Sequence, residues 1–534
     1  MATVSSLNAA PVLANALSVP ASPVPVSTSA LETPNSALPD PSTIVTINPA
    51  NLTNSQPTYS IPSQLTFLPP TVTWANDSSD AISEAMAAAY KTESITNQAF
   101  FGLGNVGSAL LDRLGTTDGD FSQSMQVTPA DSLGALGSTA QGAQADIELT
   151  IETKSGVEVD ITLQSGPDGM TVSEHSSGTL SAAEQSALGN LSGAFQDAIN
   201  GLTAIPPTLD LSGLTQFDPS VLASVHLQSN VTGEQPPQPI QSIDFQANSA
   251  TRTVSVSGLA GTLNVNVDAA ESAILGNRAQ QAAAIADYLT QFDEADSRGQ
   301  GDASFMAMFK DAFTQMLSGS DTSPSQSLPG TTYAPSLAEV EHAMLTGLPD
   351  FNASITDAAQ SPNPLRVSEQ DTFSYQVSQS TDVEGNQQGG TITQHQQSHL
   401  IASYHESLTG MPLALTAKMN SQTYDYVQIN DVANSTTEIE NENGKLAKAS
   451  LTQSADQSTR VSKYEMGELV SDITTPSEES QSSDLLALLK PFFDGGQVEQ
   501  DSAGKWQQTL SSLHDMIFLQ PNPADLSADS SASI

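Results

Sequence analysis

Strict alternation of apolar and polar residues is the feature that most limits what this chain can fold into. Between Ile147 and Leu163 the apolar residues take every second position, interrupted once by Lys154–Gly156. A period of two residues is that of a β-strand with one buried and one wetted face. The interruption supplies a turn, so the sequence predicts a hairpin, with residues 170–175 as a third strand.

A helical period follows these strands. Ser181 and Glu184 have the spacing of a capping box, and apolar residues from Leu188 to Leu202 recur at helical intervals. Three more strands between residues 240 and 268, followed by a helix over 269–292, repeat the order. The sequence therefore predicts two βββα units. An internal duplication is a hypothesis that requires the two units to share one strand order.

Longer alternating segments occupy residues 366–470. Asn443-Gly444, between two of them, is the strongest hairpin signal in the chain. The strands are polar on one face, which is typical of an antiparallel sheet wetted on one side. Helices are expected near residues 483–489 and around Trp506. The predicted fold class is α+β, with a long-stranded antiparallel sheet and flanking helices.

The N-terminal segment is rich in Pro, Ser, Thr and Ala and has no sustained period. Such a segment buries too little apolar surface to offset its ordering entropy, so we expect it to be disordered. The predicted organisation is a disordered leader at 1–75, a helical segment plus linker at 76–144, βββα units at 145–235 and 236–330 (the second with an added helix), a helix and antiparallel-sheet domain at 331–520, and a tail at 521–534.

The net charge of −44 comes from a shortage of cations, because 59 acidic residues face only 15 Lys and Arg. Nucleic acid and anionic membrane surfaces both need clustered basic residues, so neither is an expected partner. A basic protein partner remains possible on charge grounds. The chain has no cysteine, which excludes disulfides and thiolate chemistry. No apolar run reaches the roughly 18–20 residues of a membrane-spanning helix.

Gly102, Gly104 and Gly107 form a G-x-G-x-x-G string, the spacing with which dinucleotide-binding enzymes approach the pyrophosphate of NAD. That chemistry requires the glycines to lie between a buried parallel strand and a helix. The preceding residues, TESITNQAFF, are polar and helix-like instead. We therefore favour a pair of helices that approach or bend at glycine, with an NAD-dependent dehydrogenase as the alternative.

His395 and His399 are the candidate metal ligands. Imidazoles four residues apart share a helix face and could hold zinc, but the Gln/Thr/Ser context predicts a strand. Four residues of strand span about 13 Å, which is too far for one ion. We predict a solvated polar face here. The sequence also lacks G-x-S-x-G, the P-loop string and H-E-x-x-H, which favours a protein that is not an enzyme.

The expected function follows from these patterns. The uncharged N-terminus resembles, in composition, the leaders of bacterial proteins exported through needle or flagellar systems. Together with the absence of cysteine and the long polar strands, it favours a non-enzymatic bacterial protein, exported or surface-associated, with a structural or interaction role. The alternatives are an NAD-dependent dehydrogenase and an acidic module that binds a basic protein.

Overall fold

A computed structural model describes most of the chain from residue 71 onward. The described residues are 71–96, 103–117, 119–128, 144–166, 168–204, 207–233, 239–270, 274–318, 337–386, 388–408, 410–493 and 503–526. The predicted leader, residues 1–75, lies outside them apart from its last five residues.

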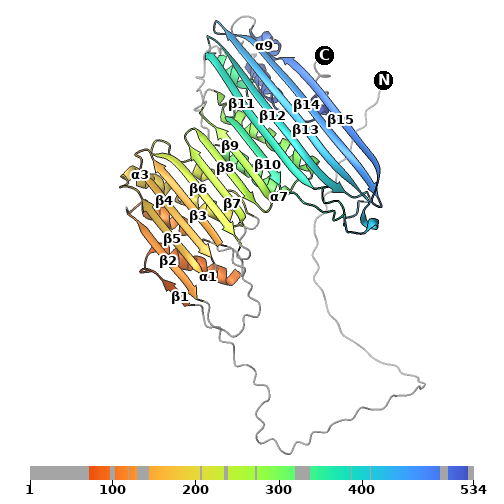
Figure 1. Cartoon of the computed structure of the whole chain (residues 1–534). Helices are drawn as coiled ribbons and strands as arrows, with labels where there is room; N and C mark the ends of the chain where they lie inside the picture. Colours follow the sequence, from red (N-terminus) through yellow and green to blue (C-terminus); the bar gives the residue numbers. More distant parts are fainter. Residues whose placement is uncertain are drawn as a thin grey trace, which may run out of the picture. The chain divides into compact units, whose positions relative to one another are not determined.

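One sheet of fifteen strands organises the molecule (Figure 1), and every strand pairing among the described residues is antiparallel. Its order is β1-β2-β5-β4-β3-β6-β7-β8-β9-β10-β11-β12-β13-β14-β15. The strands are β1 (Thr71–Trp74), β2 (Phe121–Thr128), β3 (Gln144–Thr153), β4 (Glu158–Gly166), β5 (Gly169–Ser176), β6 (Leu222–Thr232), β7 (Pro239–Asn248), β8 (Thr251–Gly258), β9 (Gly261–Asp268), β10 (Asp350–Asp357), β11 (Thr372–Asn386), β12 (Gly389–Glu406), β13 (Tyr424–Glu442), β14 (Lys445–Glu465) and β15 (Glu468–Asp484).

The helices lie on one side of this sheet, behind it in Figure 1. They are α1 (Ala81–Thr96), α2 (Val106–Leu114), α3 (Ala182–Asn190), α4 (Ser192–Leu202), α5 (Ser212–Thr215), α6 (Arg278–Gly299), α7 (Ala303–Leu317), α8 (Leu337–Ala343), α9 (Leu485–Phe493) and α10 (Ala503–Met516). We call the covered side of the sheet the inner face and the other side the outer face.

The core lies between the inner face and the helices. Its centre is an aromatic cluster in which Phe292 of α6 packs against Phe313 of α7, with ring centroids 4.9 Å apart in an edge-to-face arrangement. Phe351 of β10 and Tyr375 of β11 contact the same cluster. Edge-to-face aromatic pairs add to the stabilisation that comes from burial alone. The cluster therefore packs helices α6 and α7 against the middle of the sheet.

The structure confirms the α+β fold class and the antiparallel sheet with flanking helices. Asn443 and Gly444 both have positive φ, 53° and 72°, as a tight hairpin turn requires. Ser181 and Glu184 form the predicted capping box at the start of α3. The helix expected over 269–292 begins later, at Arg278, because Asn277 caps it there.

Several strands were not predicted. Strand β2 lies within the segment expected to be a linker, where the short pattern Phe121, Met125 and Val127 is flanked by Gly- and Ser-rich sequence. Strands β1, β6 and β10 were also missed. Met466 and Gly467 form a second turn with positive φ. It joins the end of β14 to the start of β15.

The two βββα units differ in how the chain continues from them. After α5 the chain returns as β6 beside β3, the first strand of its meander. After α8 it returns as β10 beside β9, the last strand of its meander. This difference in strand order counts against an internal duplication. The predicted divisions at 235/236 and 330/331 are bridged by paired strands, β6 with β7 and β9 with β10.

Candidate functional site

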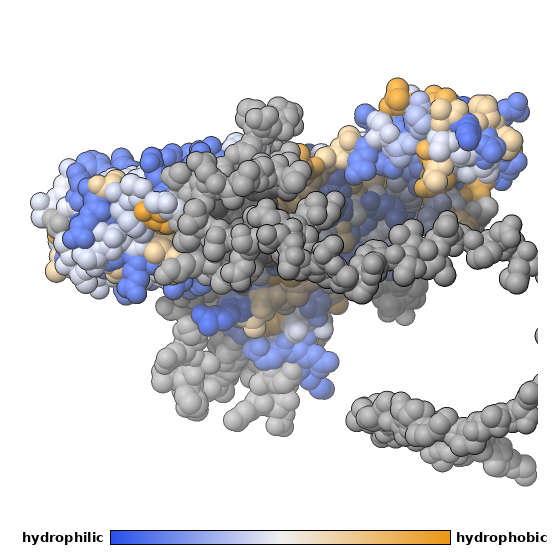
Figure 2. Space-filling model, turned by 90° about the horizontal axis from the view of Figure 1, so that it is seen from below, coloured by the Kyte–Doolittle hydropathy of each residue, from blue (hydrophilic) through white to orange (hydrophobic). Residues whose placement is uncertain are grey.

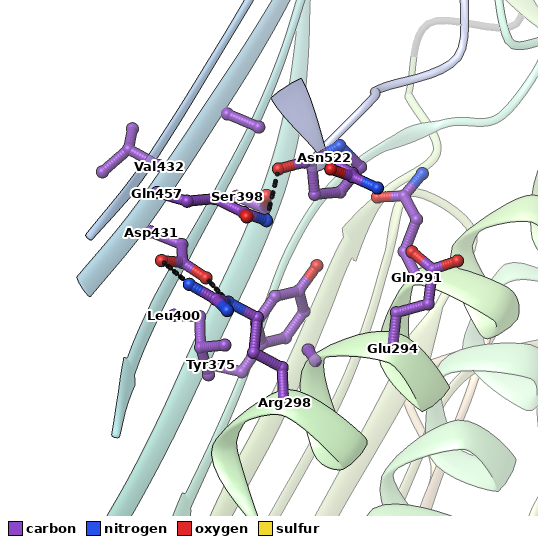
Figure 3. Close-up of a pocket in the computed structure, with 13 residues that line it drawn as sticks. Gln291, Glu294, Arg298, Tyr375, Ser398, Leu400, Asp431, Val432, Gln457 and Asn522 are labelled. Carbon is purple, nitrogen blue, oxygen red and sulfur yellow. Dashed lines mark hydrogen bonds and ion pairs between the residues drawn. The ribbon is translucent and has the colours of Figure 1, made fainter. Parts of the chain in front are cut away.

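A pocket lies between helix α6 and the inner face of strands β11–β14 (Figure 3). Gln291, Glu294 and Arg298 line it from α6. Its floor is buried and includes Tyr375, whereas its rim at Glu294 is exposed to solvent. The full lining is Gln291, Glu294, Ala295, Arg298, Tyr375, Ser398, Leu400, Asp431, Val432, Ala433, Gln457, Pro521 and Asn522.

The chain after α10 forms one wall of the pocket because amide side chains of the sheet hold it in place. Gln396 of β12 donates to the carbonyl of Ile517 at 2.8 Å, and Gln453 of β14 donates to that of Phe518 at 2.8 Å. Gln457 donates to the carbonyl of Pro521 at 3.1 Å. These bonds satisfy backbone groups that would otherwise be buried without partners.

An ion pair closes another side. The Nε of Arg298 donates to Oδ2 of Asp431, and its Nη2 donates to Oδ1 at 3.0 Å. Nη2 also donates to the hydroxyl of Thr459 at 3.1 Å. This fork geometry suits a planar guanidinium and a carboxylate. The two charges neutralise each other, so the guanidinium adds little net positive charge to the pocket.

The amide of Gln291 has a fixed orientation and a free oxygen. Its Nε2 donates to Oδ2 of Asp287 at 2.6 Å and to the carbonyl of Leu519 at 3.0 Å. Both N–H groups are therefore used. Its Oε1 is buried and has no hydrogen-bond partner in the described part of the chain. A buried acceptor without a donor is costly, so this atom is open to a donor from outside the protein.

The hydroxyl of Tyr375 has a similar environment. Tyr375 is 2 % exposed, and its oxygen makes no hydrogen bond of normal geometry, although Ser398 lies beside it. Figure 3 shows this hydroxyl pointing into the space between the α6 side chains and the strands. Burial raises the pKa of Tyr375, so the phenol stays protonated. It can donate one hydrogen bond and accept another.

The surroundings of the pocket are acidic. Burial is the main cause of the raised pKa of Glu294 at the rim, and the nearby carboxylate of Asp525 raises it further. Burial also raises the pKa of Asp287 to about 6, against the opposing hydrogen bond from Gln291. The pocket thus combines hydrogen-bond acceptors with a negative electrostatic environment. The space open to the centres of water molecules is about 50 Å³, which is enough for a small group.

A second polar cluster lies at the end of strands β12–β14, where the bridge between Gln360 and Asp371 holds a loop over the outer face. His405 is enclosed there, with its side chain 1 % exposed. Its Nδ1 lies 2.6 Å from Oδ1 of Asp371, and its ring packs between Tyr424 and Tyr426. Because the imidazole is enclosed, the cluster fastens the loop and does not present a base to solvent.

The residues of the glycine string lie in a helical context. Gly102 is outside the described residues. Gly104 has a φ of 49°, and Gly107 lies in α2, where an added Cβ would come within 2.4 Å of Ile199 on α4. Helix α1 precedes the string, and no parallel strand leads into it within the described part of the chain. Gly107 allows α2 to approach α4 closely, and Gly104 lies against Ala89 of α1.

The two candidate metal ligands lie on the outer face of β12 and point to separate partners. His395 Nδ1 is 3.0 Å from the hydroxyl of Thr436, and His399 Nε2 is 2.8 Å from Oδ1 of Asn430. Among the described residues, no group of three His, Cys, Asp or Glu side chains is placed to hold a metal ion.

Polar side chains cover the outer face of the sheet. One register row crosses eleven adjacent pairs of strands from β4 to β15 and contains only polar residues: Asp160, Thr150, His226, Gln246, Thr253, Asn266, Asn352, Ser378, Gln397, Asn434, Ser454 and Ser480. Acidic side chains far outnumber basic ones on this face. Among the described residues of β3–β15, the basic side chains here are Lys445, Lys448 and Arg460, and the latter two are ion-paired.

Three pairs of carboxylates stand directly opposite each other across neighbouring strands of the outer face. They are Glu152 with Glu158, Asp268 with Asp350, and Asp456 with Glu478. Like charges directly opposite in a sheet are destabilising. In the described part of the chain no salt bridge joins any of these six side chains to a base. Like charges therefore face each other at three separate places without a base beside them, although the Asp350 carboxylate accepts hydrogen bonds from the backbone N–H and the hydroxyl of Thr381, at 2.8 Å each.

Comparison with protein-family models, curated proteins and solved structures gives no match to this chain. Its function is therefore inferred from its own residues. No helix in the described part of the chain is both long and apolar enough to cross a membrane.

Neither the pocket nor the carboxylate pairs were predicted from the sequence. Gln291, Tyr375 and Asp431 come from segments far apart in the chain, and each is unremarkable in its local context. The carboxylate pairs depend on strand register. The pair formed by Glu152 and Glu158 could have been found, because both residues flank the predicted Lys154–Gly156 turn.

Replacing Tyr375 by Phe should leave the free energy of unfolding unchanged or raise it by up to about 1 kcal/mol, because the substitution removes a buried hydroxyl that has no partner. Tyr288→Phe is the matched control. The Tyr288 hydroxyl donates to Oε1 of Gln396 at 3.0 Å, so its loss should cost about 1 kcal/mol. Urea denaturation of both variants measures the difference, and equal losses would contradict the assignment of Tyr375.

The raised pKa of Asp287 predicts a pH dependence. Its folded value is about 6 against a reference of 3.8, so the folded state favours the protonated acid. Stability is therefore present at low pH and is lost as pH rises between these two values. Asp287→Asn should reduce this loss by about 1–2 kcal/mol, measured by denaturation at pH 4 and pH 7. Asp197→Asn, on the exposed side of α4, should leave the pH profile unchanged.

Proposed function

We propose that this chain is a non-enzymatic interaction protein that binds a basic partner along the outer face of its sheet. The observation that carries the proposal is the set of three cross-strand carboxylate pairs, Glu152–Glu158, Asp268–Asp350 and Asp456–Glu478. Each pair costs stability in the free protein. A cation placed between the two carboxylates removes this repulsion. The free energy that the repulsion costs the free protein is then recovered when a basic partner binds.

The geometry of the face supports an extended partner. The three pairs lie on strands β3/β4, β9/β10 and β14/β15, which are spread across the sheet. Neighbouring strands are about 4.8 Å apart, so the first and last pairs are separated by several tens of ångströms. Between them the face offers Ser, Thr, Asn and Gln side chains that can donate and accept hydrogen bonds. An extended, lysine-rich polypeptide matches this arrangement of charge and polarity.

The experiment compares two triple variants with the same change in net charge. Glu158→Gln, Asp268→Asn and Glu478→Gln remove one carboxylate from each pair. Glu84→Gln, Asp197→Asn and Asp515→Asn remove three carboxylates from helices α1, α4 and α10. Binding of a fluorescent lysine-rich peptide to each full-length protein is measured by anisotropy, and urea denaturation gives the stability.

We expect the outer-face variant to bind the peptide at least several-fold more weakly and to unfold at a higher urea concentration, because repulsion is relieved. The helix variant should bind like the parent. Binding to the parent should disappear at about 1 M salt, where the Debye length is about 3 Å. Equal losses in the two variants would attribute binding to net charge and overturn the role of the face.

The proposal includes an exported or surface-associated location in a bacterium. Its support is compositional: the N-terminal segment carries no charged residue before Glu32 and no basic residue before Lys91, and the chain has no cysteine. Cell fractionation of the source organism tests it. Recovery in the medium or surface fraction is the expected result, and recovery only with cytosolic markers, in a strain with working export systems, would contradict it.

A further inference from the structure

We propose that the pocket between α6 and strands β11–β14 binds a primary ammonium group carried on a narrow alkyl stem. The pocket lies on the inner face of the sheet (Figure 3), so this site is separate from the outer face and does not depend on the function proposed for it.

The acceptors of the pocket define the ligand as a hydrogen-bond donor. The Oε1 of Gln291 is buried without a partner, and both N–H groups of the same amide are engaged. Gln291 cannot reverse its amide without breaking those two bonds. The Tyr375 hydroxyl, also buried without a normal hydrogen bond, offers a second oxygen. Glu294 supplies a carboxylate at the rim. An ammonium group has three donors and could satisfy all three oxygens.

Charge selects a cation over a neutral donor. Glu294 lies at the rim, and Asp287 and Asp525 are close enough to interact with it electrostatically. Arg298, the cation that lines the pocket, is neutralised by its fork to Asp431. A cation entering the pocket therefore meets a net negative field at reduced dielectric, where charge-assisted hydrogen bonds are stronger than in water.

Size limits what the ammonium group can be attached to. The space open to the centres of water molecules is about 50 Å³, against the roughly 10–15 Å³ that a single water requires on the same measure, so the pocket has room for a small group. Leu400 and Ala433 supply apolar surface beside the polar oxygens, which suits a methylene stem. A lysine side chain or a simple alkylamine fits this description, and a quaternary ammonium, which has no N–H donor, does not.

The test uses the full chain and n-butylammonium chloride, with n-butanol as the neutral analogue of the same length, and detects binding by saturation-transfer NMR and calorimetry. We expect butylammonium to bind and butanol to bind much more weakly. Glu294→Gln should weaken butylammonium binding about five- to tenfold through loss of a charge-assisted hydrogen bond. Asp293→Asn, one residue earlier on α6 and paired with Lys310, should change it less than twofold.

Tyr375→Phe separates the ligand site from an ordered-water site. If the pocket is built for the ammonium group, this variant binds butylammonium several-fold more weakly and is at least as stable as the parent when no amine is present. A destabilised variant would mean that water already satisfies the hydroxyl, and that result would overturn the proposal. Equal binding of butanol and butylammonium, no detectable binding, or equal effects of Glu294→Gln and Asp293→Asn would also overturn it.

Figure 2 shows that apolar surface also gathers on the lobe at the upper right. Five apolar side chains outside the pocket are each exposed by more than half of their surface: Met411, Met419, Met466, Leu469 and Val470. An alkylamine could bind to such a patch through its stem. The butanol comparison detects that binding, because the alcohol would then bind as well as the amine.

Discussion

Burial of one face only is the constraint on which the rest of this molecule depends. A single sheet of fifteen strands has its helices on one side, so each strand must place apolar side chains inward and polar side chains outward. A slip of one residue in any strand would exchange the two sets, which fixes the register across the whole sheet. Phe245, Val265 and Phe351 are buried on the inner side, while Asp244, Asn264 and Asn352 face outward. The regular outer surface is a direct consequence.

The same constraint explains where the charge of the chain is placed. Few carboxylates can enter the core, because burying a charge without a partner is costly. Glu174 is one that does, and it is paired with Arg113 at 2.5 Å; even so, burial raises its pKa to about 7. Most of the other acidic residues on the strands must lie on the outer face. With so few Lys and Arg in the chain, several of them face each other without a cation between them. Because the sequence has few Lys and Arg, carboxylates at defined positions of the sheet lie opposite each other without a base to neutralise them.

Much of this fold could be predicted from the sequence because alternation is a local signal. It identified the hairpin of β3 and β4, the meander of β7–β9 and the Asn443-Gly444 turn. It missed β1, β2, β6 and β10, and it also failed where inner positions are polar. In β13, Asp431, Ser435 and Thr437 point inward, so the pattern breaks and one strand looks like two. These residues are tolerated because tertiary partners such as Arg298 and the carbonyl of Ile517 satisfy two of them. Such partners cannot be inferred from the neighbouring sequence.

The candidate pocket lies where the inner face of the sheet is polar instead of apolar. Over most of the sheet the inner face is apolar, and the helices pack against it. Towards β12–β14 the inner positions include Ser398, Asp431 and Gln457, on which an apolar helix face would leave buried polar atoms unsatisfied. The segment after α10 covers this region, since its backbone carbonyls can accept hydrogen bonds from the amides of Gln396, Gln453 and Gln457. An irregular segment fills space less completely than a helix does, and the gap left beside α6 contains the two unpartnered oxygens. The polar inner positions that obscured β13 in the sequence are therefore also the reason that a pocket lies at this place.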